Sequence, residues 1–136
     1  VVSGKVSPKI KKMYAAVKEG QAIAVRMIRH GVLARTVHEA IQKKFEELDF
    51  KTGFVNGKVQ GFFHSTGHGL GLCVHEAPTV SARSKSMAQK GMVVTIEPGI
   101  YLSGWGGVRI EDMVVVTERG GEVITPSNKR LRCIEL

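Results

Sequence analysis

Residues 64–75 read His64-Ser-Thr-Gly-His-Gly-Leu-Gly-Leu-Cys-Val-His75, so three of the five histidines of the chain fall within one short segment. Glycines flank His68, and residues without a Cβ let the backbone pass close to a ligand or a metal ion. Imidazole is a common ligand of zinc, iron, cobalt and manganese. The segment therefore indicates a binding site. The alternative for one or two of these histidines is a hydrogen bond within the core.

Two glutamates lie in β-rich runs further along the chain. Glu97 ends the run Met92-Val-Val-Thr-Ile-Glu97, and Glu111 interrupts the run Val108-Arg-Ile-Glu-Asp-Met-Val-Val-Val116. A charge in a buried strand is costly unless it is paired or coordinates an ion. Both glutamates are therefore candidate functional residues.

Side chains alternate along a strand, so Arg109 and Glu111 are expected on one face and Asp112 on the other. One imidazole with several carboxylates suits a hard or borderline divalent metal. His68, Glu97 and Glu111 are thus candidate metal ligands. The alternative is an Arg109–Glu111 ion pair on a solvated face.

The remaining pattern predicts two helices followed by strands, which is typical of an α+β fold. Ser7-Pro8 is an N-cap signal for a helix over 8–29, and Thr36 with Glu39 has capping-box spacing for a second helix over about 37–48. Strands are predicted at residues 70–75, 92–97, 108–117 and 122–125.

Length and composition are those of one ordinary globular domain of 136 residues, with 43% apolar residues and no apolar run long enough to span a bilayer. The net charge of +8 comes from scattered lysines and arginines without interleaved aromatic residues, a pattern that argues against nucleic-acid binding. His30 and His38 fall at helix ends and are expected to have only structural roles. Two cysteines without a CxxC pair favour a reducing, cytoplasmic setting.

Three ordered segments resemble the C-terminal part of the pita-bread-fold metallopeptidases, specifically the Xaa-Pro aminopeptidases and Xaa-Pro dipeptidases (prolidases). They are Gly67-His-Gly-Leu-Gly-Leu-Cys-Val-His-Glu-Ala-Pro78, Thr95-Ile-Glu-Pro-Gly-Ile-Tyr101 and Gly107-Val-Arg-Ile-Glu-Asp112. The resemblance implies two helices packed on a curved, mainly antiparallel sheet.

The same resemblance implies a role for each candidate residue. His68, Glu97 and Glu111 match metal ligands, with Glu111 bridging two ions and Glu97 also moving a proton. His75 matches a catalytic histidine that contacts the substrate carbonyl, and His64 matches a second active-site histidine on the proline side. Arg109 resembles the arginine that organises the site, and with His64 and His75 it is expected to contact substrate.

Family members also carry two aspartate ligands upstream of the first helix matched here, and this chain holds only Asp49 and Asp112. Residues 1–136 are therefore expected to be a partial catalytic domain, the second half of the fold without the upstream half that bears those aspartates. The full enzyme would use two divalent ions, manganese, cobalt or zinc, and the site in this chain would be incomplete. These 136 residues alone are expected to be inactive.

The function implied is metal-dependent hydrolysis of the bond between an N-terminal residue and a following proline. The expected partners are a peptide with proline at its second position and further copies of the enzyme in a homo-oligomer, with no membrane. Two alternatives are a peptidase of the methionine aminopeptidase type and a non-catalytic pita-bread binding module.

Overall fold

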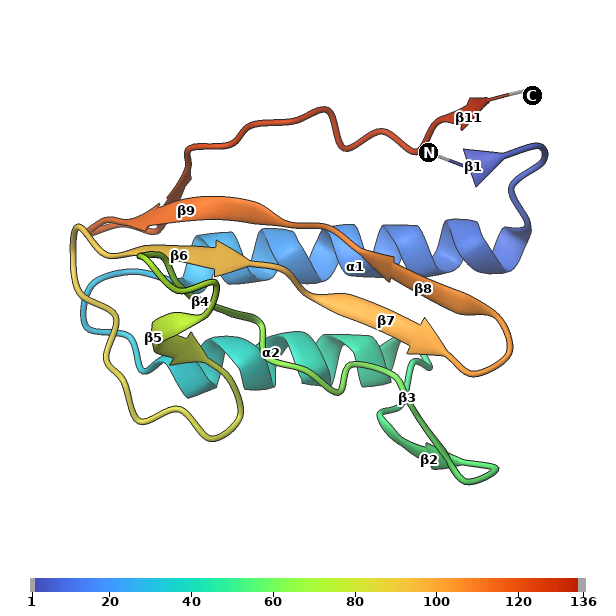
Figure 1. Ribbon diagram of the computed structural model, residues 1–136, viewed down its shortest axis with the longest axis horizontal. Helices are drawn as coiled ribbons and strands as arrows, with labels where there is room; N and C mark the ends of the chain where they lie inside the picture. The colour runs from blue at the N-terminus through green and yellow to red at the C-terminus, as the bar shows by residue number, and fades with distance from the viewer. Residues whose placement is uncertain (1, 135–136) are drawn as a thin grey trace.

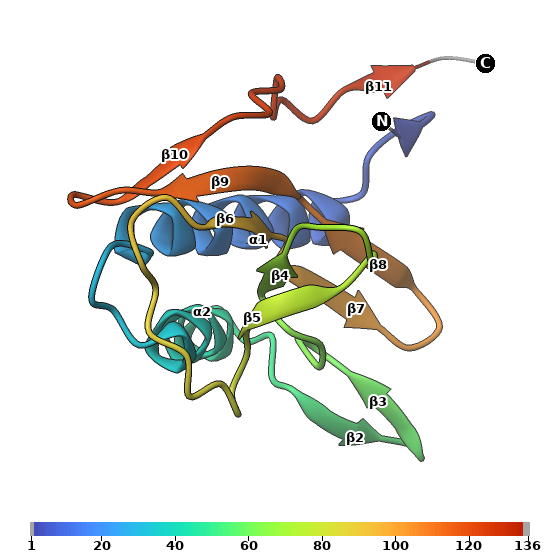
Figure 2. The ribbon, with the colours of Figure 1, turned by 60° about the vertical axis from the view of Figure 1, so that its left-hand side comes forward.

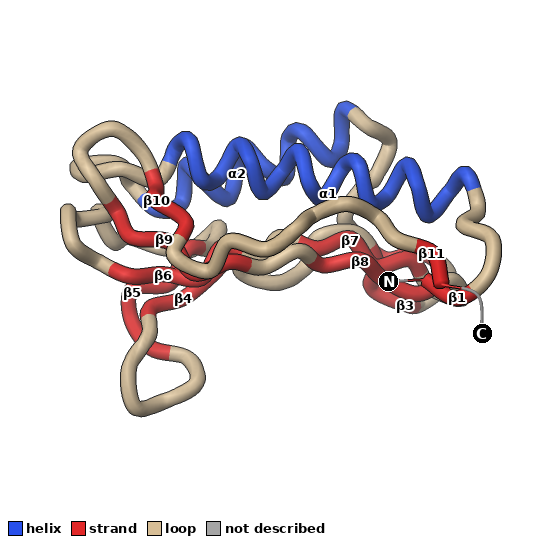
Figure 3. The backbone as a smooth tube through the Cα atoms, turned by 90° about the horizontal axis from the view of Figure 1, so that it is seen from above, coloured by secondary structure: helices blue, strands red, loops and turns tan. Residues whose placement is uncertain are grey.

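The computed structural model describes residues 2–134 and places two helices on one side of a series of short strands (Figure 1). The helices are α1 (Pro8–Met27) and α2 (Ala34–Glu47). The strands are β1 (Val2–Ser3), β2 (Gly53–Val55), β3 (Lys58–Gln60), β4 (Gly67–Gly69), β5 (Glu76–Val80), β6 (Val93–Ile96), β7 (Gly99–Leu102), β8 (Gly106–Arg109), β9 (Asp112–Val116), β10 (Gly121–Val123) and β11 (Cys133–Ile134). Seen from above, the helices form one layer and the strands a second (Figure 3).

The main sheet has five strands in the order β10-β9-β6-β4-β5, and all of its neighbours are antiparallel. Strands β7 and β8 form a separate antiparallel hairpin, as do β2 and β3, whereas β1 and β11 pair in parallel. Helices that precede a mainly antiparallel sheet make this an α+β architecture, as the sequence pattern predicted.

Helix α1 begins where the sequence predicts. The Ser7 hydroxyl accepts the Ile10 N–H at 3.2 Å, and Pro8 occupies the first turn, where its missing N–H costs nothing. The helix ends at Met27, before the expected residue 29, because the next segment leaves the helix to reach β9. There the His30 N–H donates to the Thr117 carbonyl at 2.9 Å.

The capping box predicted for the second helix is wrong. Helix α2 begins at Ala34, and the Thr36 hydroxyl donates to the Leu33 carbonyl at 2.8 Å inside the first turn. The Ala34 N–H donates to the Ser86 carbonyl at 2.9 Å, and the N-cap residue Leu33 makes no side-chain hydrogen bond to the helix. A tertiary contact therefore moved the helix start.

The two helices pack closely at Gly20. A Cβ at this position would lie 2.6 Å from the Phe45 ring and 3.1 Å from Ile41, so only glycine allows this approach. Phe45 and Ile41 are fully buried, and the Phe45 ring meets Phe62 edge to face at 5.5 Å. The core therefore lies between the helices and the strands.

The strand predicted over residues 70–75 is a loop, and the strands lie on either side of it as β4 and β5. The Glu76 carboxylate accepts the Cys73 N–H at 2.7 Å and closes the loop. A Cβ at Gly71 would lie only 1.9 Å from that carboxylate, so a larger residue there would displace the Glu76 side chain from this contact. The loop projects from the side of the strands opposite the helices (Figure 3), and Leu72 and Val74 are exposed on it.

The strand predicted over residues 108–117 is split into β8 and β9. Strand β8 pairs with β7, whereas β9 pairs with β6, and the chain changes partner at Ile110 and Glu111. The Ile110 side chain is buried, and its N–H donates to the Pro98 carbonyl at 3.4 Å. The predictions at 92–97 and 122–125 correspond to β6 and β10 with shifted ends.

The C-terminal segment after β10 runs beside α1 before it reaches β1 (Figure 2). Lys129 on this segment contacts the buried Asp112 carboxylate at 2.7 Å, and Gln21 of α1 donates to the same oxygen. Asp112 thus points toward the helix side, as the alternation predicted. Neither of the two described helices has the length and apolar content needed to cross a membrane.

Candidate metal and peptide site

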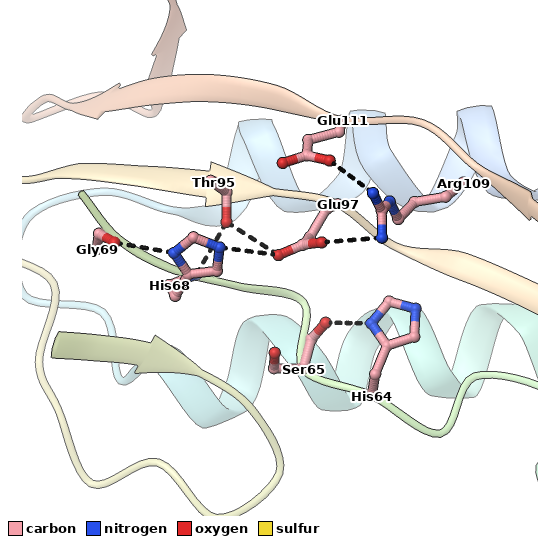
Figure 4. Close-up of polar contacts among 8 residues, drawn as sticks. All are labelled: His64, Ser65, His68, Gly69, Thr95, Glu97, Arg109 and Glu111. Carbon is pink, nitrogen blue, oxygen red and sulfur yellow. Dashed lines mark hydrogen bonds and ion pairs between the residues drawn. The ribbon is translucent and has the colours of Figure 1, made fainter. Parts of the chain in front are cut away.

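His68, Glu97, Arg109 and Glu111 lie on the face of the strands opposite the helices (Figure 4). His68 is the central residue of β4, and Glu97 directly follows β6, which pairs with β4. Arg109 ends β8, and Glu111 lies in the connection to β9. Side chains from three segments of the chain, around residues 68, 97 and 109–111, are therefore brought to one surface.

His68 and Glu97 form the central pair. The His68 Nε2 atom lies 3.3 Å from the Glu97 Oε1 atom, and both side chains are mostly buried. The His68 Nδ1 atom lies 2.9 Å from the Gly69 carbonyl, which only accepts, so Nδ1 carries the hydrogen in the neutral ring. The Nε2 lone pair then faces a carboxylate oxygen. An imidazole nitrogen and a carboxylate oxygen are both ligands of divalent metals, so the donor set of this pair fits a metal ion.

Arg109 joins the two glutamates. Its guanidinium lies 3.7 Å from Glu97 and 3.3 Å from Glu111, and both Arg109 and Glu111 are partly open to solvent. The expectation that Arg109 and Glu111 share a face is confirmed. Among residues 2–134, no three side chains of His, Cys, Asp or Glu are close enough to hold a metal ion. The structure therefore places His68 beside Glu97. Glu111 is connected to this pair through Arg109, which contacts both glutamates.

Thr95 is a site residue that the sequence reasoning missed. Its hydroxyl donates to Glu97 Oε1 at 3.2 Å and accepts the His68 backbone N–H at 3.0 Å. The signal was present in the sequence, because Thr95 lies two residues before Glu97 and so shares its strand face. Thr95 was missed because it is a single polar residue in the otherwise apolar run before Glu97.

His75 lies beside His68 at the end of the 70–75 loop. The two rings meet edge to face with centroids 4.6 Å apart, and His75 is exposed. His75 therefore lies next to the His68–Glu97 pair, and its exposed side chain has room to meet a ligand.

His64 lies apart from this pair, in an aromatic cluster. Its ring is 5.3 Å from both Phe62 and Tyr101, and Phe63 lies 5.2 Å from Tyr101. The His64 Nδ1 atom donates to the Ser65 carbonyl at 2.7 Å, and Nε2 is buried without a hydrogen-bond partner among the described residues. A cavity of about 590 Å³ borders His64 and is lined by residues of α2, β5 and the segment before β4. Tyr101 was not singled out from the sequence.

The two histidines assigned structural roles have such roles in the structure. His38 is buried, and its Nδ1 atom lies 3.0 Å from the Thr66 hydroxyl. Burial disfavours the charged ring and lowers the pKa of His38, and the nearby His64 lowers it further. His30 accepts the Lys90 N–H at 3.3 Å. Neither belongs to the His68–Glu97 pair.

Comparison with known proteins places the chain in a family. Residues 1–118 match metallopeptidase family M24. An uncharacterised peptidase, YqhT, from Bacillus subtilis is 43% identical over 131 residues, and an Xaa-Pro dipeptidase from Pyrococcus furiosus is 36% identical over 131 residues. Each alignment covers 96% of this chain and 35% of the relative.

A solved structure gives the same result. The Xaa-Pro dipeptidase from Bacillus anthracis superposes with a TM-score of 0.87 at 42% identity, covering 98% of this chain and 36% of that protein. The chain thus spans roughly a third of the length of these relatives and corresponds to their C-terminal part. The predicted α+β pita-bread architecture is confirmed. On the family match, the sequence relatives and the shared fold, this chain belongs to metallopeptidase family M24.

Proposed function

We propose that residues 1–136 form part of the catalytic domain of a metal-dependent peptidase that hydrolyses the bond between an N-terminal residue and a following proline. The observation that carries the proposal is the His68–Glu97 pair, in which an imidazole nitrogen and a carboxylate oxygen lie 3.3 Å apart. The names of the relatives supply the substrate class. Because the chain covers 35% of such relatives, the activity is proposed for a protein of their length.

The metal ligands of this proposal are His68, Glu97 and Glu111, with two further carboxylates from residues outside this chain. Bound divalent ions, manganese, cobalt or zinc, would activate water and polarise the scissile carbonyl. Arg109 would hold the Glu111 carboxylate toward Glu97, which its contacts at 3.3 Å and 3.7 Å support. With part of the ligand set missing, residues 1–136 alone would bind at most one ion, weakly, and would be inactive.

The chain's own residues would handle the proton and the oxyanion. Glu97 would take a proton from the attacking water and deliver it to the departing prolyl nitrogen, a role suited to a carboxylate in a mostly buried position. His75 would donate a hydrogen bond to the carbonyl oxygen as negative charge develops there. Its exposed position beside His68 supports this role.

Selection of proline would depend on shape. The nitrogen of an Xaa-Pro bond carries no hydrogen, so a site cannot recognise it through an N–H and must fit the ring. The aromatic cluster of Phe63, His64 and Tyr101 offers apolar surface for such a ring. A cytoplasmic, homo-oligomeric enzyme remains part of the same proposal.

Steady-state kinetics on a protein of the relatives' length that contains this chain test the proposal. Matched Xaa-Pro and Xaa-Ala peptides and a Met-Ala-Ser peptide are the substrates, and we expect cleavage of Xaa-Pro with near inertness toward Xaa-Ala. Faster cleavage of the Met peptide would favour a methionine aminopeptidase. Absence of cleavage by metal-loaded protein would favour a binding module.

Paired variants locate the chemistry. Glu97→Gln should lower kcat far more than it changes KM, because it alters a proposed ligand and the proton carrier but leaves the aromatic cluster intact. Glu118→Gln is the matched control, since Glu118 is exposed and contacts only the Lys90 ammonium, at 3.6 Å, among the ion pairs of the described residues. Near-normal turnover of Glu97→Gln would refute the assignment.

A further inference from the structure

A single hydroxyl connects the two residues of the central pair. Thr95 Oγ1 accepts the His68 backbone N–H at 3.0 Å, so its own hydrogen is free to donate to Glu97 Oε1 at 3.2 Å. The donor order is therefore defined, from the His68 amide through the hydroxyl to the carboxylate. Glu97 Oε1 is also the oxygen that faces His68 Nε2. Thr95 thus acts on the oxygen that a metal ion would use (Figure 4).

The backbone around Thr95 is built for this contact. A Cβ at Gly67 would lie 1.7 Å from the Thr95 carbonyl oxygen and 3.0 Å from its hydroxyl oxygen, so β4 approaches Thr95 only because residue 67 is glycine. The Glu97 N–H donates to the Thr66 carbonyl at 2.7 Å, which holds the same two segments together one step further along. His68 and Glu97 are therefore held at a defined separation.

Because the Thr95 hydroxyl is buried, water cannot readily take over its hydrogen bonds. Thr95 is 4% exposed and Glu97 is 8% exposed, so water has little access to replace a lost hydroxyl. Without it, the His68 N–H loses its acceptor and Glu97 Oε1 loses a donor. The Glu97 carboxylate would then be free to turn toward Arg109, which already contacts its other oxygen at 3.7 Å.

We propose that Thr95 is a positioning residue that fixes Glu97 Oε1 opposite His68 Nε2, so that both can bind one divalent ion. This proposal rests on the proposed function, because it concerns the same ligands. A threonine that only filled space would be replaceable by valine, which has the same shape. A threonine that positions Glu97 requires its hydroxyl, and serine would serve in its place.

The test uses the 136-residue chain and cobalt(II) chloride as the probe. Native chain, Thr95→Val and Thr95→Ser are titrated by calorimetry and by visible absorption of cobalt. Thr79→Val is the matched control, because Thr79 is exposed and lies opposite His68 in the β4–β5 pair. Hydrogen exchange of the His68 amide, followed by NMR, gives a second readout that needs no metal.

We expect Thr95→Val to weaken cobalt binding about tenfold to a hundredfold, the usual effect of losing a group that orients a ligand. Thr95→Ser and Thr79→Val should stay within about threefold of the native chain, and only Thr95→Val should speed exchange of the His68 amide. Native-like behaviour of Thr95→Val, or a serine variant as weak as the valine variant, would overturn the proposal. If the native chain binds no cobalt, the expectation that these residues alone hold one ion fails, and the amide exchange decides whether Thr95 joins the two residues: unchanged exchange in Thr95→Val would overturn the proposal.

Discussion

The close approach of β4 to β6 makes Gly67→Ala a severe test of the site's framework. The added Cβ would lie 1.7 Å from the Thr95 carbonyl oxygen and 2.6 Å from its carbonyl carbon. These are backbone atoms of a strand paired on both sides, so no side-chain rotation can relieve the clash. The two segments would have to separate by roughly 1 Å, in a region packed as densely as a crystal.

That separation would break specific contacts. The hydrogen bond from the Glu97 N–H to the Thr66 carbonyl is 2.7 Å long, and that from the His68 N–H to the Thr95 hydroxyl is 3.0 Å. Each is worth about 1 kcal/mol, and forced overpacking adds about 1–3 kcal/mol. The expected loss in free energy of unfolding is therefore about 3–5 kcal/mol, which lowers the Tm by roughly 10–20 °C for a domain of this size.

Thermal and urea unfolding followed by circular dichroism would measure this loss. Gly53→Ala is the matched control, because residue 53 is also a strand glycine but no atom lies within 4 Å of its added Cβ. We expect the control to melt close to the native chain. A Gly67→Ala protein that melts within about 2 °C of native would refute the reasoning, since so small a shift corresponds to well under 1 kcal/mol.

Three further predictions concern the surface, the core and the C-terminal segment. The loop at 70–75 should drive self-association, because Leu72 is fully exposed and Val74 is largely exposed. Light scattering should show a mass that rises with concentration and that Leu72→Asp reduces, and a stable native monomer would contradict this. The pKa of His38 lies below its usual 6.5, so the unfolded chain binds the proton more readily and the free energy of unfolding should fall as the pH drops below about 6.5. The urea midpoint should decrease less between pH 7.5 and 5.5 in His38→Gln than in the native chain, and an equal decrease would contradict the assignment. Lys129→Met should lower the free energy of unfolding by about 2 kcal/mol or more, because it leaves the buried Asp112 carboxylate without its cation. Adding Asp112→Asn should restore part of this loss, and additive losses in the double variant would argue against the pairing.

The start of α1 was predictable because its signal is local. Ser7 and Pro8 mark the start of α1 through contacts within one turn, and the structure contains that cap. The start of α2 was misplaced because the Ala34 N–H is satisfied by Ser86, a partner 52 positions away in the chain. No window of local sequence contains that partner. The β2–β3 hairpin had a usable signal, since Asn56 and Gly57 both adopt positive φ as a tight turn requires.

The loop at 70–75 was misread for a different reason. Its alternation of leucine and valine with small residues imitates a strand, and the β-rich pattern carries no information about Glu76 folding back onto Cys73. The glycines were the better guide, because Gly71 leaves the space that the Glu76 carboxylate fills. Apolar side chains exposed on such a loop indicate a surface for contact rather than a core strand.

Residue types at the site were predictable, whereas their separations were not. A spacing of two residues put Arg109 and Glu111 on one face, and that relation survives at 3.3 Å even though the predicted strand breaks between them. The break at Ile110 depends on a change of strand partner, and it decides how far Glu111 stands from Glu97. Glu97 depends likewise on Thr95 and on a glycine in another strand, neither of which bears a charge or a metal-binding group. The chemistry of this site is therefore carried by its ionisable residues, and its geometry by the small residues that let the strands approach.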